Sequence, residues 1–259
     1  MNRRTVVLFM LLGLLLLAPA LAPFDPMKTN PDAQLQPPSL SHLFGTDYLG
    51  RDIFSRILHG GRRTLALSLL ALGLTAAPGI GLGLWAGTLR GQAERIMNGA
   101  LNVLQAFPSL LLALVIVTLL GTGPLSIAVA TGLPLIVPFS RLIEAATRQV
   151  LSQEFVEATR SLGASDLYLV RHTLFANIQP TLWSTIGIVF GFCVLNNAAL
   201  SFLGLSGGLG VPDWGVILAE ARFGVRSAPW GAIAPGAAIT ALVVAIQQIT
   251  ADLAKSNSR

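Results

Sequence analysis

Residues 64–89 read TLALSLLALGLTAAPGIGLGLWAGTL, a run of 26 residues without one ionisable side chain. An α-helix needs about 20 mostly apolar residues to cross the roughly 30 Å of hydrocarbon in a bilayer, so this run predicts a transmembrane helix. Further apolar runs of the same character lie at residues 5–21, 96–120, 125–139, 182–203 and 232–249. The sequence therefore predicts an all-α integral membrane protein with about six transmembrane helices.

The composition agrees with a chain that lies in lipid, because 53% of its residues are hydrophobic and only 11% are charged. The formal net charge is +5, but Lys and Arg lie between apolar runs and form no basic stripe, so nucleic-acid binding is not expected. The single cysteine, Cys193, excludes a disulfide framework and a cysteine-based metal site within one chain. The histidines His42, His59 and His172 have no ligand spacing, so we expect neither a metal site nor a cofactor.

Two of the apolar runs leave alternatives open. Residues 125–139 form a short run that contains Pro134 and Pro138, but neighbouring helices can satisfy the backbone groups that a proline frees. Residues 5–21 follow two arginines and resemble a signal peptide, with small residues near the end that a peptidase could accept. This run is longer than a usual signal core, which favours a retained first span over a cleaved one.

These runs divide the chain into four parts. Residues 1–22 are predicted to be the first transmembrane helix, and residues 23–63 an irregular extracytoplasmic segment with a short interfacial helix at residues 52–58. Residues 64–253 hold the five other spans, including a cytoplasmic loop at residues 141–180. Residues 254–259 are expected to form a cytoplasmic tail.

The loop at residues 141–180 is helical in pattern. An apolar stripe at helical spacing consists of Leu151, Phe155, Ala158 and Leu162. Two charge pairs at helical spacing, Glu144 with Arg148 and Glu157 with Arg160, support the same helix. We expect the helix to stop at Gly163 in a left-handed cap.

A second short helix is predicted to start at Ser165 as its N-cap. Asp166 then lies in its first turn and Arg171 with His172 in its last turn, as the helix dipole favours. The arginines of the whole loop favour a cytoplasmic location, although the segment at residues 23–63 is also basic. An even number of spans then places both termini in the cytoplasm.

Several motifs resemble a known family. Glu157-Ala158-Thr159, followed by Gly163, resembles the EAA-and-glycine loop of permease subunits in binding-protein-dependent ABC importers. Residues 44–56, FGTDYLGRDIFSR, are similar to the segment after the first span in dipeptide, oligopeptide and nickel permeases. Further matches to that subfamily lie at residues 106–108, 138–141, 163–166, 201–205 and 212–215.

The resemblance implies a type I importer permease with a MetI-like fold in the cytoplasmic membrane. It implies as partners a homologous second permease, two ABC ATPase subunits, an extracytoplasmic solute-binding protein and membrane lipid. It also implies that ATP hydrolysis, on the partners, drives uptake of a dipeptide, an oligopeptide, nickel or a metal chelate. The residues implied to dock in the ATPase or to hold the docking loop are Glu157, Ala158, Gly163, Ala164, Ser165, Asp166, Leu167, Tyr168 and Leu169. The chain itself has no Gly-x-x-x-x-Gly-Lys-Ser/Thr sequence, so we expect it not to be an enzyme.

Polar residues inside the spans allow other interpretations. Asn196 and Asn197 either bond to neighbouring helices or line the substrate path. Gly204-Leu205-Ser206-Gly207 matches the Gly-x-Ser-Gly pattern of an intramembrane serine protease, but no histidine base follows His172. An ion-driven secondary transporter would place ionisable groups in its spans, and the predicted spans contain none. Gly79, Gly83 and Gly87 repeat every four residues, which predicts close packing against another helix.

Overall fold

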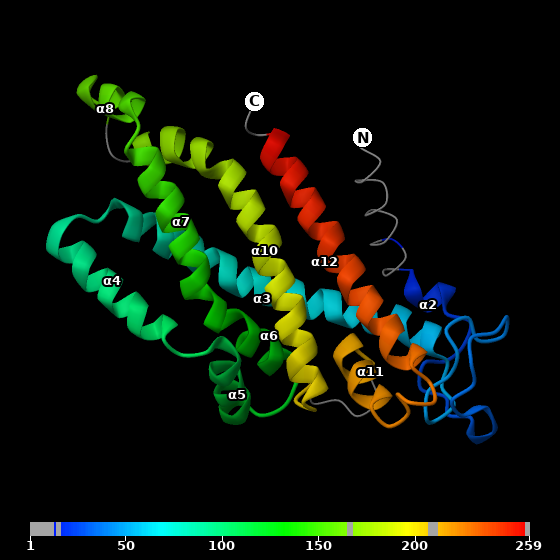
Figure 1. The fold of residues 1–259 in the computed structure, drawn as a ribbon. Helices are drawn as coiled ribbons and strands as arrows, with labels where there is room; N and C mark the ends of the chain where they lie inside the picture. Colours follow the sequence, from blue (N-terminus) through cyan, green and yellow to red (C-terminus); the bar gives the residue numbers. More distant parts are fainter. Residues whose placement is uncertain (1–12, 14–16, 165–167, 207–211, 257–259) are drawn as a thin grey trace.

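Four long apolar helical segments form the body of the protein, which is described by a computed structural model over residues 13, 17–164, 168–206 and 212–256. Within these residues the segments long and apolar enough to cross a membrane are Ile53–Thr88, Pro124–Leu151, Phe175–Phe202 and Trp230–Ser256. Figure 1 shows α7, α10 and α12 running side by side, with α3 crossing them. The predicted all-α membrane fold is confirmed, while most of the first predicted span lies outside the described residues.

The fourth predicted span is confirmed in spite of its prolines. The segment found there is longer than the predicted residues 125–139 and consists of α6 (Pro124–Gly132), a 3-10 turn η2 (Leu133–Leu135) and α7 (Ile136–Leu151). Residues 141–151, which were predicted to belong to the loop, are therefore part of α7. Pro134 lies in the first turn of η2 and Pro138 in the first turn of α7. A first-turn N–H has no partner within its own helix, so a proline costs little there.

The third predicted span is bent. Residues 96–120 were expected to form one helix, but α4 (Gly91–Gln105) and α5 (Ser109–Leu120) meet at an angle of 75°. The break falls at residues 106–108, where Pro108 disfavours a helical conformation at Phe107. The bent pair gives the described part of the chain a fifth candidate span.

The short interfacial helix predicted at residues 52–58 is not a separate element. It is the beginning of α3 (Ile53–Thr88), and Asp52 caps α3 by accepting a hydrogen bond from the Ser55 N–H at 2.8 Å. A separate interfacial helix would place the charged Arg56 at the surface. Its side chain is in fact buried in ion pairs, so the helix continues through this region.

Glycines hold α3 against α7. A Cβ atom on Gly79 would lie 2.5 Å from the Phe139 ring, and one on Gly83 would lie 2.5 Å from the Ser140 carbonyl oxygen. A Cβ on Gly87 would meet the Thr147 side chain at the same distance. The packing role predicted from the four-residue repeat is therefore confirmed.

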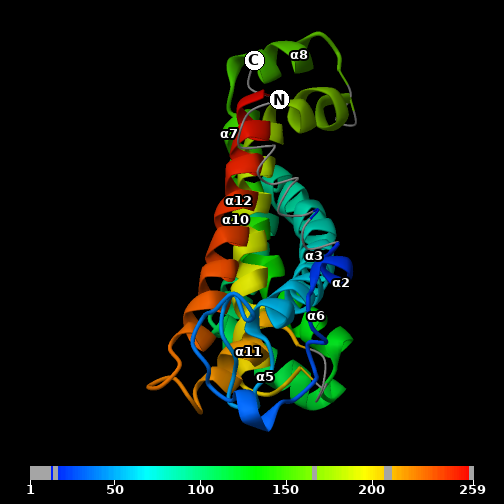
Figure 2. The same cartoon turned by 90° about the vertical axis from the view of Figure 1, so that its right-hand side faces the viewer.

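The last part of the chain is α10 (Phe175–Phe202), α11 (Trp214–Ala221) and α12 (Trp230–Ser256). Their apolar core includes Phe190, Val194, Trp214 and Leu242. The first residues of the predicted tail, 254–256, belong to α12. Figure 2 shows that the end of α12 lies at the same end of the bundle as α8 (Glu154–Ser161), while α11 and residues 24–52 lie at the opposite end.

Candidate functional site

The predicted coupling loop contains α8 (Glu154–Ser161), which protrudes beyond one end of the bundle (Figures 1 and 2). One continuous helix up to Gly163 was expected, but α7 ends at Leu151, and Gln153 is extended. The Ser152 hydroxyl donates to the Gln149 carbonyl oxygen at 2.9 Å, which is how serine competes with helical hydrogen bonds. The two-residue break therefore gives α8 a direction of its own.

Gly163 closes α8 in the left-handed conformation, with φ at +86°. Its N–H donates to the Arg160 carbonyl oxygen at 3.0 Å, and the Ala164 N–H donates to the Thr159 carbonyl oxygen at 3.3 Å. These two bonds form a Schellman cap, so the predicted cap is confirmed. A Cβ atom on Gly163 would have no neighbour within 4 Å, so the backbone conformation and not crowding requires glycine here.

The predicted apolar stripe of the loop is mostly exposed. Phe155 is 44% exposed and Leu162 is 89% exposed, and Ala158 is exposed too. Val156, on another side of α8, is buried and connects the helix to the bundle. This leaves the stripe, together with the exposed Glu157, accessible to another protein.

The second half of the loop differs from the prediction. Ser165, Asp166 and Leu167 lie outside the described residues. Tyr168 is half exposed, Leu169 is buried, and a π-helical segment η3 (Leu169–Leu174) leads directly into α10. The predicted second helix therefore does not end near Arg171 and His172. The helix is continuous because buried side chains after that point, Leu174 and Ile178, pack with Ala146 of α7.

The two asparagines of α10 have different surroundings. Asn197 is 2% exposed, and its amide donates to the Thr64 carbonyl oxygen at 3.4 Å and lies 3.5 Å from the Ser68 hydroxyl, both on α3. This is interhelical hydrogen bonding, the first of the two interpretations. Asn196 is half-buried. A role of either residue in the substrate path stays a prediction.

At the opposite end, the motif at residues 212–215 joins α11 to α3. Asp213 caps α11 by accepting from the Val216 N–H at 2.9 Å, and the Trp214 indole donates to the Ile57 carbonyl oxygen at 2.9 Å. Burial raises the pKa of the Asp213 carboxyl above its ordinary value, and the hydrogen bond from the Val216 N–H together with the charge of Arg63 opposes that shift. Asp213 is thus a buried carboxyl group at the start of α11.

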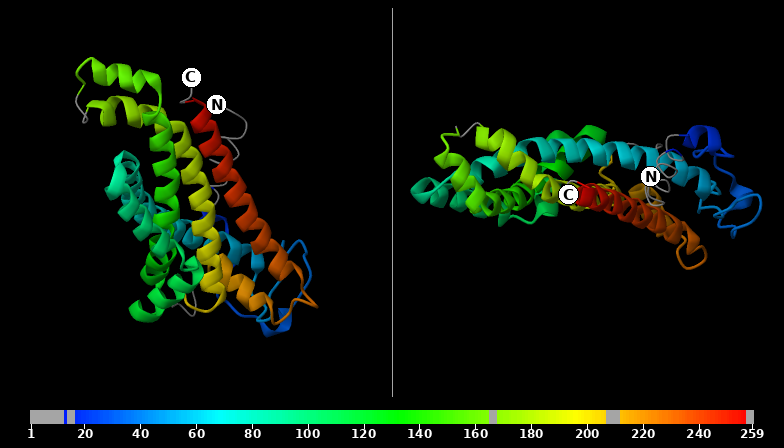
Figure 3. Two further views of the ribbon diagram at one scale, coloured as in Figure 1. Left: turned by 60° about the vertical axis from the view of Figure 1, so that its left-hand side comes forward. Right: turned by 90° about the horizontal axis from the view of Figure 1, so that it is seen from above.

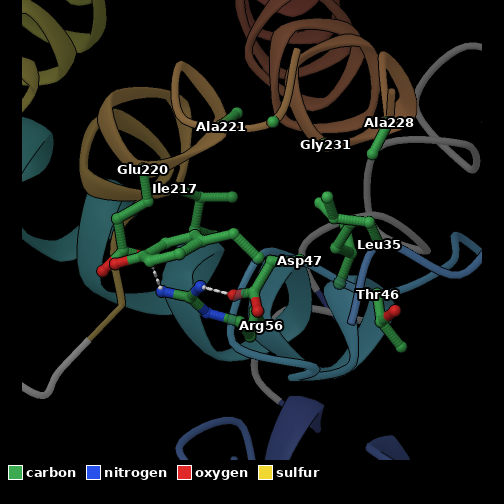
Figure 4. A pocket seen from close by; sticks show the side chains of 12 residues that line it. Leu35, Thr46, Asp47, Arg56, Ile217, Glu220, Ala221, Ala228 and Gly231 are labelled. Carbon is green, nitrogen blue, oxygen red and sulfur yellow. Dashed lines mark hydrogen bonds and ion pairs between the residues drawn. The ribbon is translucent and has the colours of Figure 1, made fainter. Parts of the chain in front are cut away.

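A charge cluster that the sequence did not indicate lies at this end and is formed by Asp47, Arg51, Arg56 and Glu220. Figure 4 shows Arg56 between Asp47 and Glu220. Arg56 contacts both carboxylates, with its Nη2 atom 2.6 Å from Glu220 Oε2. Arg51 does the same, at 2.7 Å from Asp47 and 2.6 Å from Glu220. The two arginine side chains are only 5% and 2% exposed.

The motif at residues 44–56 contained three members of this charge cluster, but nothing in it indicated that they pair with Glu220. That residue lies 169 positions from Arg51 along the chain. The cluster fixes residues 46–56 against α11. Gly45 directly precedes this segment and Gly50 lies within it, and their φ values of +71° and +73° allow the turns at these two positions.

The comparisons with known proteins agree with this arrangement. Residues 79–256 match the family described as "Binding-protein-dependent transport system inner membrane component", which covers more than half of the chain. The chain belongs to this family. Membership identifies it as a multi-pass permease subunit of an ABC importer in the inner membrane, and it implies ATPase and solute-binding-protein partners.

Two relatives of the permease illustrate the similarity. The di/tripeptide transport system permease protein DppC of Pseudomonas aeruginosa is 37% identical over 93% of this chain and 82% of its own length. The glutathione transport system permease protein GsiD of Pectobacterium atrosepticum is 40% identical over 80% of this chain and 69% of its own length.

Among solved structures, the permease is similar to a chain of the inward-facing MetNI methionine ABC transporter. The TM-score is 0.68 at 18% sequence identity, over 77% of this chain and 95% of that chain. This similarity confirms the MetI-like fold. The comparisons give no support to the serine-protease and secondary-transporter alternatives.

Proposed function

We propose that this permease imports short peptides or peptide-like solutes and that α8 with the residues after it docks in an ABC ATPase. The observation that carries the docking proposal is the exposed apolar stripe on α8, whose direction is set by the break after Leu151 and by the cap at Gly163. Burying one leucine side chain contributes about 1.5–3 kcal/mol, so Leu162 alone offers a partner substantial binding energy. In this proposal Glu157 and Gly163 hold the loop, Ala158 belongs to the exposed stripe, and the docking segment contains Ala164, Ser165, Asp166, Leu167 and Tyr168. Leu169, at the end of that segment, is buried within the permease and does not contact the partner.

The proposed complex contains this permease, a homologous second permease, two ABC ATPase subunits and an extracytoplasmic binding protein. The chain is not an enzyme in this proposal, and hydrolysis occurs on the ATPases. In support, the sequence has no Gly-x-x-x-x-Gly-Lys-Ser/Thr motif that could cradle phosphates.

A peptide substrate is supported by the names of the relatives. The DppC relatives are dipeptide or di/tripeptide permeases, and GsiD is a permease for glutathione, which is itself a tripeptide. All these solutes are small molecules of similar size that carry peptide groups and carboxylates. Nickel and metal chelates, also implied by the resemblance, have no counterpart among these relatives.

The proposed topology places α8 in the cytoplasm and residues 23–52 outside. Its support is that the two regions lie at opposite ends of the bundle (Figure 2). In a Cys193→Ala background, a cysteine at Ser161 should react only with reagents on the cytoplasmic side and a cysteine at Ser39 only with those outside. Reaction of both from one side would exclude this layout.

The docking test uses the whole complex with charge introduced on the stripe. Phe155→Asp with Leu162→Asp should abolish co-purification of the ATPase and uptake of a labelled dipeptide, while membrane abundance stays normal. Ser161→Asp is the matched control, because Ser161 is exposed on the same helix but does not belong to the stripe. Full ATPase retention in the double variant would contradict the docking role of α8.

A further inference from the structure

A row of polar side chains joins α4 to α7 near the end of the bundle that carries α8. On α4 the row contains Glu94, Asn98 and Asn102, which lie at i, i+4 and i+8 on one face. On α7 it contains Arg141, Glu144 and Arg148, which also share one face. We call these six residues the α4–α7 seam. Figure 3 shows α4 beside α7 in the view turned by 60°.

Each arginine of the seam reaches across to α4. Arg141 donates to the Asn98 carbonyl oxygen at 3.0 Å and to the Asn102 side-chain oxygen at 2.6 Å, and it also contacts the Asn98 side chain. Arg148 pairs with Glu94 at 2.9 Å. Planar guanidinium groups with several bonds each define position and angle more tightly than single contacts do.

Glu144 lies between the two arginines and holds them in place. It is 2.9 Å from Arg141 and 2.9 Å from Arg148, and it is 5% exposed. The predicted pair of Glu144 with Arg148 is thereby confirmed. Arg148 also donates to the Ala86 carbonyl oxygen near the end of α3, at 3.2 Å. The arginines are therefore preorganised on α7 before they contact α4.

Apolar packing holds α4 only weakly. Leu101 is buried, but Ile96 is 68% exposed, Val103 65% and Leu104 55%. Within the described part of the chain, the side-chain hydrogen bonds and ion pairs that α4 makes all go to Arg141 and Arg148 of α7. The position of α4 relative to the bundle thus depends largely on the seam.

Arg148 lies one turn before the end of α7, and only Ser152 and Gln153 separate α7 from α8. We infer that the α4–α7 seam makes α4 move as one body with α7, so that a displacement received by α8 reaches the bent α4–α5 pair. The six seam residues are positioning residues for transport. This inference rests on the proposed docking of the ATPase to α8.

The test measures the position of α4 directly and does not depend on transport. Spin labels are placed at Gly99 on α4 and Gln149 on α7, both exposed, in the Cys193→Ala background of the complete complex. In the unmodified seam, the label-to-label distance should be the same without nucleotide and with ATP trapped on the ATPases. A distance that changes with nucleotide while the seam is intact would overturn the inference.

Asn98→Leu with Asn102→Leu removes the side-chain hydrogen bonds of Arg141 to α4. The bond of Arg141 to the Asn98 carbonyl oxygen and the pair of Arg148 with Glu94 remain, and Glu144 stays paired with both arginines, so the variant weakens the α4 side of the seam. This double variant should broaden the distance distribution and lower transport per ATP hydrolysed by about fivefold or more, a ratio in the usual range of coupling between sites. ATPase co-purification and hydrolysis should remain. Gln92→Leu, an exposed position on α4 outside the seam, is the matched control and should change nothing.

The outcomes separate the two proposals. ATPase binding by the Phe155→Asp, Leu162→Asp variant tests the docking of α8. The label distances are measured in a chain with an unmodified α8, so they do not depend on the result for that variant. Unchanged distances and unchanged transport per ATP in the Asn98 and Asn102 variant would show that the seam does not position α4.

Discussion

Removing the Glu220 carboxylate charge should destabilise the permease more than any surface charge does. Glu220→Gln takes away the negative partner that Arg51 and Arg56 both contact at 2.6 Å. Removing one partner of a buried ion pair typically costs about 3–5 kcal/mol, because the remaining charge stays buried without full compensation. Asp47 still pairs with both arginines, so we expect the lower end of this range, about 3 kcal/mol.

The assay is thermal unfolding of the detergent-purified chain, followed by the fluorescence of its four tryptophans. For a chain of this size, 1 kcal/mol shifts the Tm by about 2–4 °C, so Glu220→Gln should lower it by roughly 6–12 °C. Glu154→Gln is the control, because Glu154 is exposed on α8. A Tm within about 2 °C of the unmodified chain would refute the assignment of a structural role to Glu220.

Three further substitutions test individual features. Gly163→Ala should cost about 1–2 kcal/mol at the left-handed cap and reduce ATPase-coupled uptake at normal membrane abundance. Gly99→Ala, at a site without positive φ, should leave uptake unchanged. Equal uptake in both variants would contradict the role of the cap. Gly83→Val should separate α3 from α7 and lower stability by about 1–3 kcal/mol, while Gly81→Val, where a Cβ has no neighbour within 4 Å, should be tolerated. The raised pKa of Asp213 means that the folded state binds its proton more tightly than the unfolded state, so the stability contribution of this group is present at low pH and is lost as pH rises through the raised pKa. Asp213→Asn keeps an oxygen that can accept from the Val216 N–H and should remove that part of the pH dependence of Tm; an unchanged slope would exclude Asp213 as its source.

Features that depend on neighbouring residues were predictable from the sequence. The cap at Gly163 depends on the conformational freedom of one residue, and the contact of Gly79, Gly83 and Gly87 with α7 depends on a spacing that places them on one face. Average hydropathy identified the long spans for the same reason. It did not identify the 75° bend at residues 106–108, because a single proline hardly changes the average.

Features that depend on distant residues were not predictable. Arg56 was placed in a short interfacial helix, because its partner Glu220 lies on a helix near the other end of the sequence. From the sequence, Arg148 was paired with Glu144 on its own helix, and the seam arginines otherwise served as evidence for a cytoplasmic loop. Nothing in the sequence indicated that Arg141 bonds to Asn98 and Asn102. A charge near an apolar run carries little information about its partner until the helices are placed.

The positions of these charges suggest how the permease can be rigid in the middle and still transmit motion. Along the middle of the bundle, α3 and α7 touch through glycines, which leaves little room for one helix to shift without the other. At one end the seam adds α4 to this unit, and at the other end Arg56 on α3 adds α11 through Glu220. We therefore expect a displacement of α7 to be shared by α3 and to reach α11. Breaking the Glu220 contacts should then reduce the movement of α11 that follows ATPase action on α8, even in a variant that still folds.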